Sequence, residues 1–262
     1  MSAGSLLLAA LPLAVGLPLL AWFVYLRTDR ADWIDVAWAY CLAAMAVLFT
    51  ALGPGDPLRR LLLGGAGALW GLRLGTHLAL RVAGSPTEDG RYLALRHSWG
   101  ARPHLPFLGF FLLQGGLNLV ISLPFLLGAS DPVPGLPAWT WAGLALVLTG
   151  VLGEAKADAQ LRAFKAAGPH GLVCRQGLWA WSRHPNYFFE WLTWVGFALA
   201  AQGRPAALAA WLAPALMYVL LTRVTGIPPT EAQALRSRGE AYRGYQRAVS
   251  PFFPWPPREA RP

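Results

Sequence analysis

Long apolar runs alternate with short polar segments along almost the whole chain. Most of these runs approach the ~20 residues that a helix needs to cross the hydrocarbon core of a bilayer. The pattern therefore predicts an all-α, polytopic integral membrane protein of one domain, residues 1–262, with seven transmembrane helices. The runs cover residues 3–26, 33–52, 58–82, 105–128, 137–155, 187–202 and 205–225, and the sixth is the shortest.

Composition agrees with this pattern. Hydrophobic residues make up 55% of the chain, charged residues only 13%, and the mean hydropathy is +0.41. These values are typical of membrane proteins and exclude an ordinary soluble domain. The first run has no Lys or Arg before it, and the basic residues Arg27 and Arg30 follow it. We therefore expect a retained first helix and not a cleaved signal peptide.

The distribution of basic residues predicts the orientation, because Lys and Arg remain on the cytoplasmic side. An N-terminus outside places 18 of the 22 basic residues inside and three outside, Arg59, Arg60 and Arg204, with Arg73 inside a helix. The C-terminus is then cytoplasmic, and the longer connections 82–104 and 156–186 face the cytoplasm. Because the basic residues lie next to the membrane, the net charge of +9 favours anionic lipid or a polyanionic cofactor over nucleic acid.

Cysteine, histidine and glycine patterns exclude several kinds of site. Cys41 lies in a helix and Cys174 in a predicted cytoplasmic loop, so a disulfide is not expected. The five histidines lack the spacing of a metal site. Gly67, Gly71 and Gly75 are four residues apart and predict close helix packing. No strand precedes them, which argues against a dinucleotide-binding glycine loop.

The segment 174–200, CRQGLWAWSRHPNYFFEWLTWVGFALA, carries the strongest candidate chemistry. Pro185 suits the first turn of a helix, which places Asn186 and Glu190 one above the other on one face. An amide and a carboxylate so placed can bind a carboxamide or ribose hydroxyls, while arginines can take phosphate. The alternative is a helix start within an interfacial aromatic belt, which explains the tryptophans but not the carboxylate. The candidate binding residues here are Arg175, Arg183, His184, Asn186, Tyr187 and Glu190.

Two further helical faces carry polar residues that can join the same site. Four residues that close the fifth run fall within an arc of about 80° at about 100° per residue; they either line a polar cavity or form an exposed ladder of ion pairs. In the tail, Thr230 and Gln233 predict a capping box at the start of a helix with a second polar face. That face packs on the bundle or on a cofactor. The residues of the two faces are Glu154, Asp158, Arg162 and Lys165, then Glu231, Arg238, Tyr242 and Tyr245.

The N-terminal half offers candidates for binding or protonating a substrate carbonyl. Arg73 and His77 share a helix face, and Asp35 is the nearest unassigned carboxylate. A buried network of the three can stabilise the fold or polarise a carbonyl, which needs a donor held in a dry cavity. The segment EDGRYLALR adds Tyr92 and Arg96. The candidate catalytic residues are Asp35, His77, Tyr92 and Arg96.

Several of these segments together resemble the bacterial steroid 5-alpha-reductase-like family of integral membrane proteins. The resemblance rests on GLWAWSRHPNYFFEWLTWVGFAL, EAKADAQLRAF, GIPPTEAQALRSRGEAYRGYQRAVSPFFPW, DRADWIDVAW, LWGLRLGTHLALR and EDGRYLALRHSWG, which span nearly the whole chain. It implies a seven-helix enzyme that uses NADPH to reduce the carbon–carbon double bond of a 3-oxo-4-ene steroid or similar lipid. Residues 140–262 would then bind the cofactor, and residues 1–130 the substrate.

Position by position, the resemblance places cofactor contacts at Asp158, Arg162, Lys165, Asn186 and Glu190. The tail near Glu231, Leu235 and Tyr242 would close over the adenine half. The chain departs from animal steroid reductases, which carry a Gln-Glu pair in the second helix and a Tyr in the third. Here Asp32 and Asp35 precede the second apolar run, and the third offers Trp70, Arg73 and His77. This departure leaves the proton donor and the substrate open.

Two other functions stay open. Membrane methyltransferases that modify isoprenylcysteine or phospholipids carry a similar RHPNY turn, Glu and tail, and bind S-adenosylmethionine. The second-helix aspartates and the EDGRY loop favour the reductase. A membrane transporter without enzymatic activity is the third possibility. We expect a monomer in the bacterial inner membrane that contacts lipid and a small lipophilic enone, with no metal and no nucleic acid.

Overall fold

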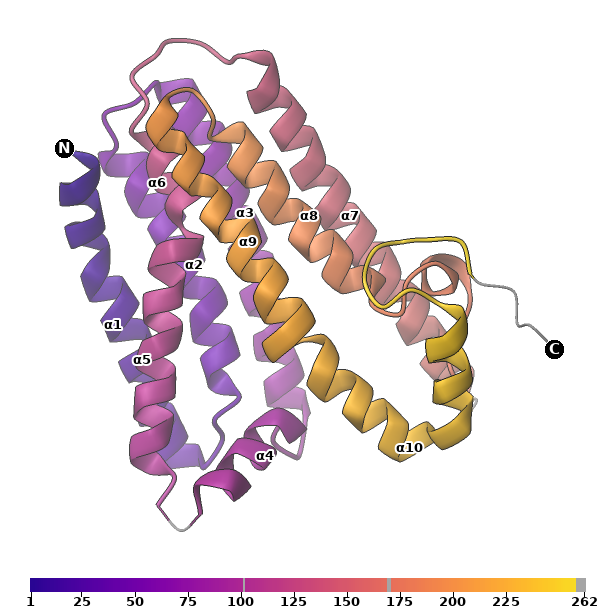
Figure 1. The fold of residues 1–262 in the computed structure, drawn as a ribbon. Coiled ribbons are helices and arrows are strands. Elements are labelled where there is room, and N and C mark those ends of the chain that lie inside the picture. The colour runs from indigo at the N-terminus through magenta and orange to yellow at the C-terminus, as the bar shows by residue number, and fades with distance from the viewer. Residues whose placement is uncertain (101, 169–170, 258–262) are drawn as a thin grey trace. The chain divides into compact units, whose positions relative to one another are not determined.

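The computed structural model describes residues 1–100, 102–168 and 171–257, which form helices joined by short connections (Figure 1). The helices are α1 Ala3–Thr28, α2 Trp33–Leu52, α3 Pro57–Gly84, α4 Gly90–Trp99, α5 His104–Ile121, α6 Leu123–Ala129, α7 Ala138–Ala166, α8 Pro185–Ala200, α9 Leu212–Val219 and α10 Ile227–Ala248. Short 3₁₀ segments η1 Gly177–Ala180 and η2 Pro205–Trp211 and a π-helical turn η3 Leu220–Val224 complete them. Within these ranges no strand occurs, so the predicted all-α class is confirmed.

Five helical segments are long and apolar enough to cross a membrane. They are Ala3–Thr28, Trp33–Leu52, His104–Ala129, Ala138–Ala166 and Pro205–Ala248. The third helix has the length, but its glycines, Arg73 and His77 reduce its hydropathy, and α8 has only 16 residues. The protein is therefore a membrane protein with several apolar helices, while the seven spans and the orientation stay predictions.

The chain divides into two compact units. The first consists of Met1–Trp141 and Phe197–Ala213, and the second of Ala142–Gly196 and Pro214–Pro262. Helices α7 and α8 each contribute residues to both units. All four candidate catalytic residues belong to the first unit, and all fourteen candidate cofactor residues belong to the second.

Close approach of helices in the first unit depends on glycines of α3. A Cβ added at Gly67 would lie 2.5 Å from the Phe125 ring, and one at Gly75 would lie 2.7 Å from the Tyr40 ring. At Gly71 the added atom would lie 2.9 Å from the Ala39 carbonyl oxygen. Contacts this short leave no room for a side chain, so the predicted role of these glycines in helix packing is confirmed.

Helix α4 is a short helix that closes one end of the first unit. Asp89 caps it by accepting a hydrogen bond from the Arg91 amide at 3.0 Å. Tyr92 is 2% exposed and packs with Tyr25, Ile34 and Phe107 of α1, α2 and α5. This aromatic core holds the charged residues of α4 beside the connection between α1 and α2.

The second unit contains its own tight helix pair. A Cβ at Gly150 of α7 would lie 2.3 Å from Thr193 Oγ1, and one at Gly153 would lie 2.3 Å from the Phe189 ring. The Trp191 indole nitrogen donates to the Pro214 carbonyl at 3.1 Å. The two glycines bring the middle of α8 directly against α7, and the Trp191 hydrogen bond joins α8 to α9.

A buried ion pair fixes the start of α3 in the first unit. The Arg59 guanidinium is fully buried and pairs with the Asp131 carboxylate, which Arg204 approaches at 3.5 Å. Arg59 Nε and Nη2 are buried with no hydrogen-bond partner among the described residues. Because removing two charges from water is costly, the pair adds little net stability by itself. Losing one partner alone would leave the other charge buried and unpaired, which is strongly destabilising.

We expect Arg59→Ala to lower the free energy of unfolding by ~3–5 kcal/mol, because it leaves Asp131 buried beside only the half-exposed Arg204. Combining Arg59→Met with Asp131→Leu replaces the pair by apolar groups and should recover most of that loss. Thermal unfolding in detergent micelles measures both. A double variant no more stable than Arg59→Ala would contradict this role.

Candidate functional site

The turn before α8 is fixed by the C-terminal segment of the chain. Ser182 Oγ donates to the Phe252 carbonyl at 2.8 Å and accepts from the His184 amide at 3.1 Å. The Arg183 amide donates to the Ser250 carbonyl at 2.8 Å. The segment after α10 therefore lies against the SRHPNY turn, and both are held by backbone contacts.

Glu231 is the centre of a polar cluster beneath this turn. Its Oε1 lies 2.6 Å from Arg183 Nε and 3.2 Å from His184 Nε2. Its Oε2 accepts from the Gln246 side chain at 2.7 Å. Glu231 thus joins the first turn of α10, the last turn of α10 and the turn before α8.

Arg183 uses its remaining donors on the end of α10. Its Nη1 donates to the carbonyls of Gln246 at 3.0 Å and Val249 at 2.6 Å, and the residue is 9% exposed. Cations bind well at helix C-termini, where carbonyls lack partners. In this structure the guanidinium is committed to the protein, so its part in the site is to position the turn.

The tyrosines of α10 face the same turn. Tyr245 is 1% exposed, and its hydroxyl donates to the Trp179 carbonyl at 2.5 Å. Trp179 in turn donates to the Ala157 carbonyl of α7 at 2.9 Å. The Tyr242 ring is buried 5.8 Å from that of Tyr245. Both tyrosines therefore pack α10 onto the unit.

Asn186 and Glu190 lie on the first turns of α8, four residues apart. Asn186 Oδ1 is buried and has no hydrogen-bond partner among the described residues. Glu190 is 9% exposed, and its Oε1 accepts from the Trp194 indole at 3.0 Å. A buried acceptor without a partner is rare in folded proteins and marks a place where a ligand donor can bind.

Tyr187 continues this surface. Its ring stacks on that of His184, with centroids 5.3 Å apart and planes inclined by 5°. Its hydroxyl lies 3.2 Å from Thr230 Oγ1. Thr230 does not form the predicted capping box, because α10 begins earlier, at Ile227, with Gly226 as its N-cap and Pro228 in its first turn. That prediction is wrong.

The polar face of α7 is graded from buried to exposed. Glu154 is 8% exposed, Asp158 is half-buried, and Arg162 and Lys165 are exposed. The exposed pair carries positive charge to the end of the helix, where a phosphate group can reach it. This face belongs to the same unit as the α8 turn.

The other basic candidates of the second unit contact backbone. Arg175 donates from Nη2 to the Ala241 carbonyl at 3.2 Å, and its guanidinium lies over the Tyr245 ring at 5.5 Å. Arg238 donates from Nε to the Leu172 carbonyl at 3.1 Å. Both join the connection after α7 to α10.

In the first unit, Asp35 is paired with residues of α4. Its Oδ2 lies 2.7 Å from Arg91 Nη2, and its Oδ1 accepts from the Tyr92 hydroxyl at 2.6 Å. Arg81 approaches Asp35 at 3.7 Å. Asp35 therefore pairs with Arg91 and Tyr92 of α4 and lies near Arg81 of α3, while the predicted network of Asp35 with Arg73 and His77 stays a prediction.

This environment changes how readily the α4 groups titrate. Burial, and then the neighbouring Asp35 carboxylate, raise the pKa of the Tyr92 phenol well above its usual value. Burial raises the pKa of the Asp89 carboxyl group, but the hydrogen bonds from Arg91 and its positive charge outweigh this effect and lower the pKa. Tyr92 is thus held neutral as a donor to Asp35, which makes it a poor source of a proton.

Arg96 is tied to the connection between α1 and α2. It contacts Asp29 Oδ1 at 2.6 Å and the Asp29 carbonyl at 2.8 Å, and its Nη2 lies 3.2 Å from Glu88. Glu88 also accepts from the Ala31 amide. His77 lies exposed on α3, with no hydrogen bond from the described residues.

Some partners were not predicted from the sequence. Trp194 is four residues after Glu190, a spacing that could have indicated the contact. Gln246, Ser182 and Glu88 carry no comparable local signal, because each meets a residue distant in sequence or a backbone group.

We expect Glu231→Ala to destabilise the protein by ~3–5 kcal/mol, because it leaves Arg183 buried without its carboxylate. Glu240→Ala is the matched control, since Glu240 pairs with Arg243 on the exposed face of the same helix and should change stability little. Thermal unfolding of the two variants in the same detergent tests this. Equal losses would rule out Glu231 as the organising residue.

Comparison with other proteins places the chain in a family. A protein of Schizosaccharomyces pombe named "Uncharacterized protein C594.04c" is 27% identical over 282 aligned positions, which cover 93% of this chain and 80% of that protein. The profile of one family matches residues 21–249, which include every candidate site residue. The chain therefore belongs to the family described as "Protein of unknown function (DUF1295)".

Proposed function

We propose that this protein is a membrane oxidoreductase that uses NADPH to reduce the carbon–carbon double bond of a lipophilic enone, with 3-oxo-4-ene steroids or similar lipids as the substrate class. The observation that carries the proposal is the buried Asn186 Oδ1, which has no hydrogen-bond partner among the described residues. The resemblance of nearly the whole chain to steroid 5-alpha-reductase-like proteins supports the same reaction.

The chemistry of the α8 turn fits a nicotinamide nucleotide. A carboxamide group donates two N–H bonds, and Asn186 Oδ1 is an acceptor that can take one of them. Glu190, one turn further along α8, presents a carboxylate that Trp194 orients through its 3.0 Å hydrogen bond. A carboxylate accepts from hydroxyl groups such as those of a ribose. The pair thus matches a ligand that carries an amide beside hydroxyls.

The phosphates of the dinucleotide would meet Arg162 and Lys165. Both are exposed at the end of the α7 face, and neither has an ion pair among the described residues. The Arg183 guanidinium already donates to the Glu231 carboxylate and to backbone carbonyls at the end of α10, so we assign it a positioning role and no phosphate contact. When bound, NADPH supplies the hydride for the β-carbon of the enone.

The enone oxygen needs a hydrogen-bond donor, and the four predicted catalytic residues are the candidates. Three of them are already engaged: Asp35 by Arg91, Tyr92 by Asp35, and Arg96 by Asp29 and Glu88. This leaves the His77 imidazole to donate to the carbonyl and to stabilise the negative charge that develops there. One donor placed in this way can lower a barrier by ~3–4 kcal/mol.

We expect Asn186→Ala to weaken NADPH binding at least tenfold, on the order of the 1.4 kcal/mol that one hydrogen bond to a buried group can contribute. Asn118→Ala is the matched control, because Asn118 is the other asparagine of the chain and its Oδ1 is also buried without a hydrogen-bond partner among the described residues, but it lies in the first unit. Fluorescence titration of purified protein with NADPH measures both. Binding of S-adenosylmethionine in place of NADPH would support a methyltransferase, and binding of neither nucleotide would favour a transporter.

His77→Ala should leave NADPH affinity unchanged and lower turnover of a 3-oxo-4-ene steroid by ~100-fold, in the range of a lost general acid. Thr76→Ala removes a neighbouring hydroxyl that pairs with Tyr40 at 3.1 Å and serves as the control. Single-turnover oxidation of bound NADPH reports the step directly. Full turnover in the His77 variant would remove His77 from the reaction.

A further inference from the structure

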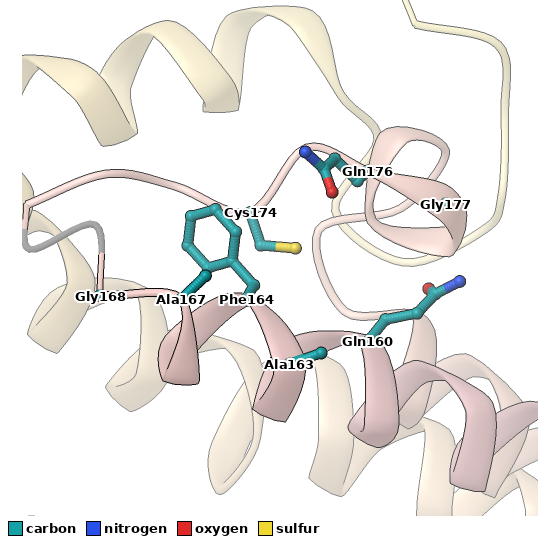
Figure 2. Close-up of a pocket in the computed structure, with 8 residues that line it drawn as sticks. All are labelled: Gln160, Ala163, Phe164, Ala167, Gly168, Cys174, Gln176 and Gly177. Carbon is teal, nitrogen blue, oxygen red and sulfur yellow. The ribbon is translucent and has the colours of Figure 1, made fainter.

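The second unit contains a pocket at the C-terminal end of α7. Its volume is about 740 Å³, within the range of ~300–1,000 Å³ that small-molecule sites occupy. Figure 2 shows the side chains of α7 on one side and the loop before η1 on the other. The lining residues are Gln160, Ala163, Phe164, Ala167, Gly168, Cys174, Gln176 and Gly177.

This pocket lies on a different face of α7 from the candidate cofactor residues. At about 100° per residue, Gln160, Ala163, Phe164 and Ala167 form a stripe centred roughly 180° around the helix from the stripe of Glu154 to Lys165. The helix backbone separates the two faces. A ligand in the pocket therefore does not touch Asp158 or Arg162.

The residues that line the pocket are uncharged, and they form one apolar part and one polar part. Alanines, the Phe164 ring and the Cys174 side chain provide apolar surface, and the two carboxamides of Gln160 and Gln176 lie on the side toward Gly177 (Figure 2). A charged ligand finds no opposite charge among these eight residues. An apolar, flat ligand finds a ring face and small side chains that leave room beside it.

Gln160 and Gly177 shape the polar end. Gln160 Oε1 accepts from the Leu178 amide at 3.0 Å, which leaves the N–H groups of the carboxamide nitrogen Nε2 for another acceptor. Gly177 has φ of +58°, and a Cβ there would lie 2.3 Å from Gln160 Nε2. Glycine at this position therefore lets the loop pass close to the Gln160 carboxamide, where a larger side chain would clash.

We propose that this pocket binds an uncharged, planar heteroaromatic ring with a nucleobase-type edge, at a site separate from the cofactor face of α7. A carboxamide offers a donor and an acceptor side by side, which matches the paired acceptor and donor atoms on the edge of adenine. A phenyl ring supports stacking of such a base, worth ~1–3 kcal/mol. The proposal does not depend on the identity of the cofactor.

The test uses Cys174 as a reporter in the full-length protein. Its side chain lines the pocket and is 6% exposed, whereas Cys41, the other cysteine, is fully buried in the first unit and serves as the internal reference. Alkylation of each thiol by N-ethylmaleimide is followed by peptide mass spectrometry. We expect millimolar adenosine to slow Cys174 alkylation at least fivefold and to leave Cys41 unchanged.

Variants separate a site from an indirect effect. Gln176→Leu should abolish protection by adenosine, because Gln176 is an exposed side chain whose loss spares the fold. Gln233→Leu, which changes an exposed glutamine of α10 outside the pocket, should retain it. Asn186→Ala should also retain protection, because Asn186 does not line this pocket. A rise of the melting temperature with adenosine in the wild type, absent in Gln176→Leu, provides the second readout.

Several results would overturn the proposal. They are no protection of Cys174 by adenosine together with no rise of the melting temperature, or equal protection in Gln176→Leu. Protection by cholesterol but not by adenosine would assign the pocket to a flat lipid. Loss of adenosine protection in Asn186→Ala would make the pocket part of the cofactor site.

Discussion

The carboxylate of Glu231 is the contact on which the second unit depends. It binds Arg183, His184 and Gln246, so one side chain joins both ends of α10 to the turn that starts α8. A charge removed from water must be paired with another charge and hydrogen-bonded. That requirement fixes the conformation of the turn. The turn in turn fixes where α8 begins, and with it the positions of Asn186 and Glu190. Arg183, the basic residue of the motif, thus holds the turn, and Asn186 and Glu190 follow it on α8.

The same requirement governs the first unit. Asp35, Glu88 and Asp131 each pair with at least one arginine, and α4 supplies two of these arginines, Arg91 and Arg96. These pairs engage Asp35 and Arg96, whereas Asn186 Oδ1 is buried without a hydrogen-bond partner among the described residues and His77 lies exposed on α3. We therefore base the proposed function on Asn186 and His77. A side chain whose ion pairs hold the fold together is poorly placed to transfer a proton or to bind a ligand.

Hydrophobic runs predicted the long apolar helices, because a segment in hydrocarbon has to satisfy its backbone internally, but they did not predict the short helix α4. The position of Pro185 predicted the start of α8, and the four-residue spacing of glycines predicted the close packing of α3. These patterns did not predict the partners of charged residues. Arg183 and Glu231 are far apart in sequence, and Asp35 could meet Arg73, Arg81 or Arg91 equally well by composition. The capping box failed for a local reason: Pro228 starts α10 before Thr230 can cap it. Asn186 could be predicted as a site residue because its motif is local in sequence. That its side-chain oxygen has no hydrogen-bond partner among the described residues follows only from the three-dimensional structure.

An experimental structure of the purified protein with NADPH would decide the assignment most directly. We predict the nicotinamide carboxamide nitrogen within ~3.2 Å of Asn186 Oδ1, the usual limit of an N–H···O bond, with the phosphates near Arg162 and Lys165. The pocket beside Phe164 should hold no part of the nucleotide. A dinucleotide bound elsewhere, or an Asn186 side chain hydrogen-bonded only to protein with NADPH present, would contradict the proposed binding mode.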